Sequence, residues 1–365
     1  MKKIVISTGG GDAPGLNAVI YAVVKAANSR GWEVYGSRGG YLGLLDTEEL
    51  MRLTPEIVED IIPLGGTIIG STNKGNPFAM PVENLAGEIQ IRDVSDRVMS
   101  NFKRMGFFCH IAVGGDGSLE IAHRFAKEKG MPVIGVPKTI DNDLESTQLT
   151  FGFDTAVSTA TEAIDKLHST AKSHDRVMVV EVMGRESGWI ALNSGISGGA
   201  DIILIPEIPF TMEKVCEKIS ENELHGKHYA IVVVAEGAGS SESGVVWKKS
   251  KEQCAPGRQE ALLGGIGEWV ANEVCIRTKK DTRSLVLGHL QRGGSPTTFD
   301  RLLALRFGAA AVRMAEAEQF DHMVALAGGD MKSVPLEEAI KGRKKVNLDN
   351  DKIATAREIG ICLGD

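Results

Sequence analysis

The sequence has few cysteines and no long apolar run, and both absences exclude classes of protein. Five cysteines occur among 365 residues, at scattered positions without Cys-x-x-Cys spacing: Cys109, Cys216, Cys254, Cys275 and Cys362. An odd, scattered set fits reduced thiols better than a disulfide framework. No run approaches the ~18 apolar residues of a membrane-spanning helix, and the run after Met1 is too short for a signal peptide. We therefore expect a cytoplasmic protein without a membrane partner.

Charge of one sign is also never concentrated along the chain. The net charge is −7, and no block of like charges forms a tail of the kind that binds nucleic acid. The short basic stretch "GRKKV" (342–346) is interpreted as a solvated surface. These features disfavour nucleic acid as a partner.

What the sequence does have is a regular alternation of short apolar runs and amphipathic stretches. The expected strands span 3–8, 33–37, 110–115, 132–137, 176–183, 201–207, 230–237, 283–289 and 322–329. The expected helices span about 15–30, 118–129, 155–172, 211–222, 260–276 and 300–318. Continuous apolar strands predict burial on both faces, as in parallel sheets whose strands are joined by helices. The expected fold class is therefore α/β.

The expected strands fall into two blocks that divide near residue 152. This pattern predicts two doubly wound, Rossmann-like domains with mainly parallel sheets and an active site in the cleft between them. The segment 240–262 interrupts the rhythm and suits an exposed loop or an insertion. Because ligands of such sheets bind beyond the carboxyl ends of strands, the residues that follow each strand are the candidates for chemistry.

The first strand leads into "TGGGDAPGLNA", in which three consecutive glycines precede a helix. Gly9, Gly10 and Gly11 would let the backbone approach a ligand, and the helix start would attract an anion such as a phosphate chain. The alternative is a tight turn that simply requires glycine. Neither the G-x-G-x-x-G dinucleotide fingerprint nor the P-loop spacing is present, which counts against a dinucleotide-dependent dehydrogenase.

Two later strand ends add carboxylates to this pattern. The stretch "GGDGS" carries Asp116, which suits a magnesium ligand beside a phosphate site or, alternatively, a helix cap. The stretch "PKTIDND" carries Asp141, a candidate general base, and Asp143, which could support it or reach the metal. In the same stretch, Thr139 could offer its hydroxyl to a phosphate. An Asp-rich and Asn-rich turn of purely structural function is the other interpretation.

The second block of strands supplies cations at its strand ends. They are Arg176, Arg185, Arg283, His289 and Arg292, and Glu236 adds an acceptor suited to sugar hydroxyls. Arginine forks match phosphate oxygens, although any single arginine is more often part of a surface ion pair. A metal-assisted phosphate site in one half and a sugar-phosphate site in the other predict phosphoryl transfer to a hydroxyl.

Taken in order, the motifs make the sequence similar to the 6-phosphofructokinase family over nearly its whole length. They are "GGDAPGLNA", "GGYLGL", "GGT", "GGDGS", "PKTIDND", "FGFDTA", "EAID", "VEVMGR" and "GHLQRGGSP". The resemblance implies a kinase of glycolysis that phosphorylates the 1-hydroxyl of fructose 6-phosphate, with magnesium as cofactor. It implies two domains, residues 1–152 plus about 292–340 for the phosphoryl donor and residues 153–291 plus about 341–365 for fructose 6-phosphate.

The resemblance also assigns a role to each matching residue. Gly11 would lie against the transferring phosphoryl group, Asp116 would hold magnesium, and Asp141 would be the base, with Thr139 and Asp143 beside it. The phosphoryl donor would also contact Gly10, Tyr41, Asn73, Lys74, Gly115, Gly117, Ser118 and Lys138. The sugar phosphate would contact Thr139, Asp141, Arg176, Met183, Gly184, Arg185, Glu236, Arg283, His289 and Arg292. Arg176 and Arg283 would come from a neighbouring subunit, so we expect a homo-oligomer, either a dimer or a tetramer.

Two departures from the family pattern change what the resemblance implies. Bacterial members carry an arginine where this chain has Asn73, so the cation that neutralises the transferring phosphate is expected to be Lys74. The two arginines of the bacterial effector site are replaced by Tyr21 and His168. Regulation of the bacterial type is therefore not expected.

Two positions indicate the identity of the phosphoryl donor, and the residues at these positions indicate different donors. Pyrophosphate users of the family typically read "GGDD", whereas Gly117 leaves that position open for a nucleotide. Pyrophosphate users also typically carry lysine at the position of Lys138, where bacterial nucleotide users carry glycine. A carboxylate would clash with and repel a nucleotide, whereas a lysine attracts either donor and can move aside. ATP is therefore the expected donor and pyrophosphate the alternative, and Ile121 leaves limited room for a ribose.

A further alternative is a non-catalytic regulatory subunit that binds sugar phosphate. Such copies usually lose a catalytic carboxylate, whereas Asp116, Asp141 and Asp143 are all present. The retained carboxylates favour an enzyme.

Overall fold

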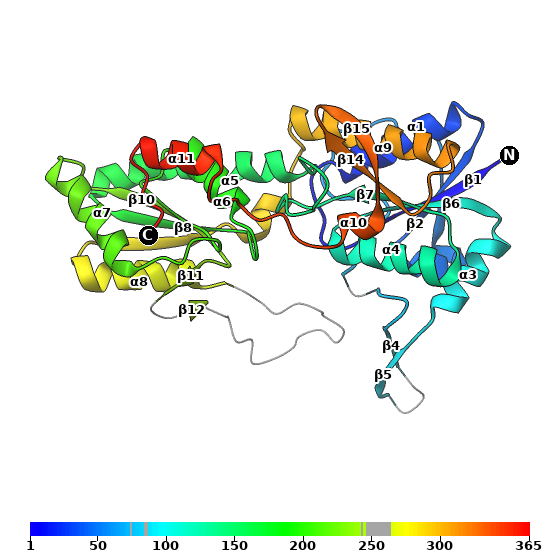
Figure 1. Ribbon diagram of the computed structural model, residues 1–365, viewed down its shortest axis with the longest axis horizontal. Helices are drawn as coiled ribbons and strands as arrows, with labels where there is room; N and C mark the ends of the chain where they lie inside the picture. The colour runs from blue at the N-terminus through cyan, green and yellow to red at the C-terminus, as the bar shows by residue number, and fades with distance from the viewer. Residues whose placement is uncertain (74, 84–86, 242–243, 246–263) are drawn as a thin grey trace.

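The computed structural model describes residues 1–365 except 74, 84–86, 242–243 and 246–263. The molecule is elongated and consists of two halves, each built around its own sheet (Figure 1). We call these the large-sheet half, with seven strands, and the small-sheet half, with four. Lys74 and most of the predicted 240–262 insertion lie outside the described residues.

The large sheet combines strands from both ends of the chain. In order across the sheet they are β15 (Asp330–Pro335), β14 (His322–Ala327), β7 (Val133–Pro137), β6 (Phe107–Gly114), β1 (Lys3–Thr8), β2 (Glu33–Ser37) and β3 (Leu50–Leu53). The five inner strands are parallel, and β15 and β3 pair antiparallel at the two edges. The chain turns back on its order between β1 and β6. This reversal is the switch point at which such sheets bind ligands.

The small sheet is parallel throughout. Its strands, in order, are β13 (Thr282–Val286), β8 (Val177–Val182), β10 (Ala230–Ala235) and β9 (Ile202–Leu204). Every residue of β8 and β10 is buried, which explains why both are apolar throughout except for Glu181 in β8. Two antiparallel hairpins are formed by β4 (Met80–Glu83) with β5 (Ile89–Arg92) and by β11 (Gly239–Ser240) with β12 (Gly244–Val245).

Helices cover both faces of each sheet. The large-sheet half contains α1 (Leu16–Asn28), α2 (Leu42–Leu45), η1 (Thr47–Glu49), α3 (Ser95–Arg104), α4 (Asp116–Lys129), α9 (Thr298–Glu316) and α10 (Leu336–Ala339). The small-sheet half contains α5 (Phe153–His174), α6 (Trp189–Ser197), α7 (Met212–Leu224), α8 (Ile266–Thr278), η2 (Gly288–Arg292) and α11 (Asp351–Glu358). Apolar side chains of α1 and α9 form the core on one face of the large sheet, and those of α3 and α4 form it on the other. The small sheet is enclosed in the same way, by α5, α6 and α11 against one face and by α7 and α8 against the other.

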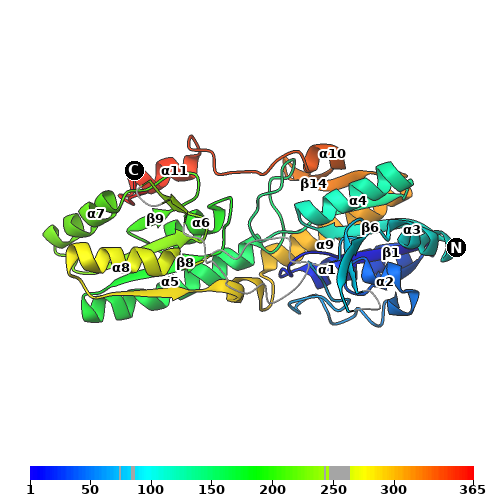
Figure 2. The same cartoon turned by 90° about the horizontal axis from the view of Figure 1, so that it is seen from below.

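The chain passes between the two halves after β7, after η2 and after α10. Figure 2 shows the last of these segments as a red strap that runs from α10 to α11. The loop after β7 and this strap lie close together, because the amide of Lys344 donates to the carbonyl of Asp143 at 2.8 Å. These crossings bring residues from both sheets to one region between the halves.

The α/β class with mainly parallel sheets is confirmed, although several shorter elements were not predicted. The sequence pattern missed the edge strands β3 and β15, the hairpin strands β4, β5, β11 and β12, and the helices α2, α3, α6, α10 and α11. Strand β15 is largely exposed, so it lacks the apolar run that marks a buried strand. Helix α6 is apolar around most of its circumference and therefore shows no amphipathic period. No helix within the described residues combines the length and the apolar composition needed to cross a bilayer.

Candidate active site

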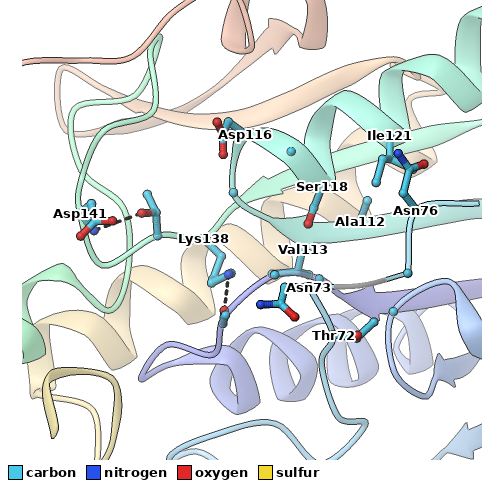
Figure 3. A pocket seen from close by; sticks show the side chains of 18 of the residues that line it. Thr72, Asn73, Asn76, Ala112, Val113, Asp116, Ser118, Ile121, Lys138 and Asp141 are labelled. Carbon is cyan, nitrogen blue, oxygen red and sulfur yellow. Dashed lines mark hydrogen bonds between the residues drawn. The ribbon is translucent and has the colours of Figure 1, made fainter. Parts of the chain in front are cut away.

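A pocket opens where the carboxyl ends of β1, β6 and β7 meet residues from the small-sheet half. It is lined by Ser7, Gly9, Gly10, Gly11, Gly40, Tyr41, Thr72, Asn73, Gly75, Asn76, Ala112, Val113, Gly115, Asp116, Gly117, Ser118, Ile121, Lys138, Thr139, Asp141, Asp143, Arg185, Glu236, Arg292 and Arg343. Figure 3 shows it as a long trough with Asp141 at one end and Ile121 and Asn76 at the other. Lys138, Asp116 and Ser118 lie between these ends. The switch point of the large sheet is therefore the location of the pocket, as the topology predicts.

Two glycine-rich loops form the floor of the trough. The amide of Gly9 donates to the carbonyl of Val113 at 2.9 Å, which joins the ends of β1 and β6. Helix α4 begins immediately after Gly115, and its first turn lines the pocket. The free amides of a helix start attract an anion. A Cβ atom built at Gly117 would have no described atom within 4 Å beyond its own helix backbone and chain neighbours, and Gly117 lines the pocket, so this position is open to the trough.

Lys138 is buried in the middle of the trough. Its side-chain amine donates to the carbonyl of Gly11, and its backbone amide donates to the carbonyl of Gly114 at 2.9 Å. Burial, together with the charge of Arg292, lowers the pKa of Lys138 to about 8. The amine is therefore still mostly protonated at neutral pH, and it lies beside the first glycine loop.

The two aspartates of the "PKTIDND" loop differ in their surroundings. One carboxylate oxygen of Asp141, Oδ1, is buried and has no hydrogen-bond partner among the residues that the structure describes. The side chain of Asp143 accepts a hydrogen bond from the hydroxyl of Thr139 at 3.1 Å, and the same hydroxyl accepts from the amide of Asp141 at 3.1 Å. Burial, and then the charge of Asp143, raise the pKa of Asp141 well above its usual range. Asp141 thus carries a free acceptor oxygen that can take up a proton near neutral pH.

The small-sheet half contributes Arg185, Glu236 and Arg292 to the same pocket. Arg292, at the end of η2, donates to the carbonyl of Asp12 at 3.1 Å and lies against the first glycine loop. Glu236 follows β10, and burial raises the pKa of its carboxyl group while the charge of Arg185 opposes that rise. A side chain at Gly237 would come within 1.8 Å of the carbonyl oxygen of Arg185, so glycine is required for the two loops to meet.

Asp116 and Arg343 form an ion pair at the rim of the pocket. The guanidinium of Arg343 donates to Oδ2 of Asp116 at 2.7 Å. The sequence interpretation of "GRKKV" as a solvated surface is therefore wrong for Arg343, which comes from the strap after α10 and lines the pocket. Sequence reasoning missed it because Arg343 follows no strand and its place depends on where the strap crosses between the halves.

Within the described part of the chain, no cluster of three or more His, Cys, Asp or Glu side chains could hold a metal ion alone. The residues that line the pocket still fit magnesium, because Mg²⁺ is typically bound by one or two carboxylates together with waters and substrate phosphates. Asp116, at the start of α4 and beside the glycine loops, is such a carboxylate.

Tyr41 and Asn73 both line the pocket, as the sequence predicts for residues near the phosphoryl donor. Tyr41 is mostly enclosed, with its ring stacked on Phe125 at 5.1 Å between centroids. Burial raises the pKa of its hydroxyl group. Behind it, His110 accepts or donates a 2.8 Å hydrogen bond with Ser7, and burial lowers the pKa of His110 to about 3, so this histidine is neutral.

Some predicted residues do not line this pocket. They are Arg176, Met183, Gly184, Arg283 and His289, while Lys74 lies outside the described residues. Gly184 directly precedes the lining residue Arg185, and its carbonyl accepts from the amide of Gly237 at 3.0 Å. Arg176 and Arg283 instead form ion pairs with Asp281. These two arginines are the ones that the family resemblance assigns to a neighbouring subunit.

The pocket also contains residues that the sequence did not single out, including Ser7, Thr72 and Asn76. Thr72 and Asn76 belong to a segment without a helix or a long strand, so no periodic pattern marks them. Gly9 and Thr72 form an isolated parallel bridge, and the amide of Gly10 donates to the carbonyl of Thr72 at 3.0 Å. Only this tertiary pairing shows that the segment forms a wall of the trough.

The fold and the pocket define a two-sheet α/β protein whose cleft joins anion-binding loops to buried carboxylates and arginines. The phosphofructokinase family model matches residues 3–315. An ATP-dependent 6-phosphofructokinase of Chloroflexus aggregans is 50% identical, with 100% of this chain and 98% of the relative covered. The chain belongs to the phosphofructokinase family.

The chain is also similar to a relative named for another phosphoryl donor and to a solved structure. A pyrophosphate–fructose 6-phosphate 1-phosphotransferase of Streptomyces coelicolor is 45% identical, with 99% of this chain and 100% of the relative covered. The crystal structure of Pichia pastoris phosphofructokinase in the T-state superposes with a TM-score of 0.79 at 30% identity. That superposition covers 98% of this chain and 36% of the yeast chain.

Proposed function

We propose that this protein is an ATP-dependent 6-phosphofructokinase that transfers the γ-phosphoryl group of ATP to the 1-hydroxyl of fructose 6-phosphate. Asp141 carries this proposal most directly. Its buried Oδ1 has no hydrogen-bond partner among the described residues, and it lines the same trough as the glycine loops and Arg292. An acceptor hydroxyl between these groups would meet a base on one side and an anion-binding floor on the other.

In this mechanism Asp141 accepts the proton of the sugar hydroxyl as the hydroxyl oxygen attacks the γ-phosphorus. The bond from that phosphorus to the bridging β-phosphate oxygen breaks, and ADP leaves. Thr139 and Asp143 hold the loop through their hydrogen bonds, and the charge of Asp143 keeps the basicity of Asp141 high. The backbone amides of Gly10, Gly11 and Gly115, those at the start of α4, and the cation Lys138 would stabilise charge on the phosphoryl oxygens. Asp116 would hold Mg²⁺, which would neutralise charge on the donor phosphates.

We also propose a division of labour between the two halves. Residues 1–152 with about 292–340 would bind the donor, and residues 153–291 with about 341–365 would bind the sugar phosphate. Arg185 and Glu236 line the trough from the small-sheet half, and Met183 and Gly184 precede Arg185 along the chain. Together these four residues would hold the sugar ring, while Arg283, His289 and Arg292 would hold its 6-phosphate.

ATP is the donor that the open position at Gly117 favours, because a Cβ atom built there would have no neighbouring part of the described chain within 4 Å. A second candidate, pyrophosphate, is favoured by Lys138, whose buried amine lies beside the glycine loop. A lysine at this place can bind the phosphates of either donor. The space at Gly117 therefore favours the larger donor without excluding the smaller one.

The reaction itself is tested by identifying its product. Purified protein incubated with Mg²⁺, ATP and fructose 6-phosphate should form ADP and a sugar bisphosphate. Phosphorus NMR should show the new phosphate on carbon 1. Hydrolysis of ATP without a sugar bisphosphate, or a phosphate on another carbon, would contradict the proposed reaction.

The pH dependence of kcat/KM should report the carboxyl group of Asp141. Only its ionised form can accept a proton, so activity is lost as the pH falls through the pKa of Asp141. Because burial and the charge of Asp143 raise that pKa, the loss should occur at a higher pH than for an exposed aspartate. The Asp143→Asn variant removes the like charge, so its rising limb should move to lower pH. A limb that stays in place would show that another group titrates.

We further propose that a second copy of this chain completes the sugar-phosphate site. Arg176 and Arg283 do not line the pocket of a single chain, and the side chain of Arg283 is 57% exposed. Next to Arg283 on the edge strand β13, Leu285 and Val286 are also exposed, as is Leu290 in η2. An exposed apolar edge beside exposed arginine side chains suits a contact with another subunit.

Mixed oligomers test this sharing of sites. An Asp141→Asn subunit and an Arg283→Ala subunit should each be inactive alone. A mixed dimer, purified through two different affinity tags, should regain about half of the wild-type rate, because one of its two sites is intact. Mixed dimers that stay inactive would show that each site uses its own Arg283.

A further inference from the structure

Arg343 lies on the strap between α10 and α11, which crosses from one half of the molecule to the other (Figure 1 and Figure 2). The backbone of the strap is fixed on both sides of this residue. Arg343 forms an isolated antiparallel bridge with Leu144, and the amide of Lys344 donates to the carbonyl of Asp143 at 2.8 Å. The indole of Trp189 donates to the carbonyl of Lys344 at 3.0 Å. The position of Arg343 is therefore determined by the loop after β7 and by α6.

The guanidinium of Arg343 joins carboxylates from the two halves. One terminal nitrogen lies 2.7 Å from Oδ2 of Asp116 at the start of α4. The other terminal nitrogen lies 2.7 Å from Oε1 of Glu186, which follows Arg185 after β8. A planar guanidinium fixes both distance and direction between the groups that it binds. Arg343 thus spans the cleft at the carboxylate proposed to hold magnesium.

The two ion pairs contribute little to stability. The side chains are 31% exposed for Arg343 and 47% exposed for each of Asp116 and Glu186, and pairs with this much solvent access are weak. The backbone around Arg343 is fixed, yet its ion pairs add little to the free energy of unfolding. We therefore attribute to these pairs a role in orienting the carboxylates. The charge of Arg343 also opposes the rise in the pKa of Asp143 caused first by burial and then by Asp116. Three carboxylates therefore share this one cation.

We propose that Arg343 is a positioning residue, which holds the carboxylate of Asp116 in the orientation that binds donor-bound Mg²⁺ and braces that carboxylate against the opposite half through Glu186. This inference rests on the proposed role of Asp116 as the metal ligand. With Oδ2 held by Arg343, the carboxylate is fixed for binding through its other oxygen. Groups that orient a ligating carboxylate typically change metal affinity or activity by ~10–100-fold when removed.

Binding of a non-reacting donor separates this role from catalysis. The dissociation constant of β,γ-methylene-ATP is measured by calorimetry with Mg²⁺ and with EDTA, and the ratio of the two values gives the benefit of the metal. In Arg343→Gln that benefit should fall by ~10-fold or more. Arg343→Lys should restore part of it. Lys345→Gln removes the same charge from the same strap at an exposed side chain and should leave the benefit unchanged.

Glu186→Gln tests the brace to the other half. In this variant Arg343 keeps its ion pair with Asp116 but loses its ion pair with residue 186. The benefit of Mg²⁺ should therefore fall, though less than in Arg343→Gln. An unchanged benefit in Glu186→Gln would overturn the brace. An unchanged or larger benefit in Arg343→Gln would overturn the positioning role, and a larger one would identify the guanidinium as a competitor of the metal.

Asp116→Asn distinguishes failure of the inference from failure of the function on which it rests. If the wild-type benefit of Mg²⁺ survives in Asp116→Asn, the metal is held elsewhere and both the metal assignment and the role of Arg343 fall. If the benefit disappears in Asp116→Asn and persists in Arg343→Gln, the metal assignment stands and the role of Arg343 alone is wrong. The expected pattern is loss in both variants.

Discussion

Replacing Asp141 with asparagine is expected to lower kcat by ~10²–10⁴-fold, the usual contribution of a general base. Asparagine has nearly the same shape but cannot accept a proton from the sugar hydroxyl. The buried Oδ1 of Asp141 has no hydrogen-bond partner among the described residues, so the substitution breaks no bond to that atom there. The dissociation constants of MgATP and of fructose 6-phosphate, measured by calorimetry, should stay near those of the unchanged protein.

Glu145→Gln provides the matched control for this experiment. It removes one negative charge from the same loop, at a side chain that is not among those lining the pocket of the described chain. We expect kcat to change little in this variant. A similar loss in both variants would indicate a general effect of charge on the loop, and an Asp141→Asn protein that kept most of its rate would rule out Asp141 as the base.

Replacing Gly117 with aspartate is expected to reverse the donor preference. The new carboxylate would enter the open part of the trough, where it would repel the α-phosphate of a nucleotide. Placing like charges together in a binding site costs several kcal/mol, so kcat/KM for ATP should fall by about 100-fold or more, since ~1.4 kcal/mol corresponds to a factor of ten. Pyrophosphate does not reach that position and should be affected far less. Steady-state kinetics with each donor measure both effects.

Gly117→Ala is the control that separates charge from bulk. Gly117 lies in the first turn of α4 and does not have a positive φ, so alanine and aspartate can both adopt its backbone conformation. Alanine should leave the preference for ATP in place. Equal losses of ATP activity in the alanine and aspartate variants would assign the effect to bulk, and no loss in the aspartate variant would show that nucleotides do not pass this position.

The sequence predicts which residues of the large-sheet half share the pocket because that side of the pocket is built from strand ends. Gly11, Asp116 and Asp141 each follow a buried strand of the large sheet, and parallel strands end at one edge. Once the strands were recognised from their apolar runs, these residues had to lie near one another. The same reasoning extends to Arg185 and Glu236 at the ends of β8 and β10. Their presence in the same pocket depends additionally on how the two halves meet.

Other parts of the molecule could not be predicted in this way. Arg343 and Asn76 lie on segments without periodicity, and their places are determined by the strap and by contacts with distant loops. The exposed edge strand β15 lacks an apolar run, so nothing in its sequence marks it as part of the large sheet. Arg283 belongs to the edge strand β13 and does not line the pocket, and its proposed role depends on a second chain.

The donor is the central claim and can be measured directly on the unmodified protein. We expect kcat/KM for ATP to exceed that for pyrophosphate by at least tenfold, equivalent to about 1.4 kcal/mol of transition-state stabilisation, at saturating fructose 6-phosphate and Mg²⁺. The open position at Gly117 is the physical reason for this preference. Equal values for the two donors, or a preference for pyrophosphate, would contradict the assignment.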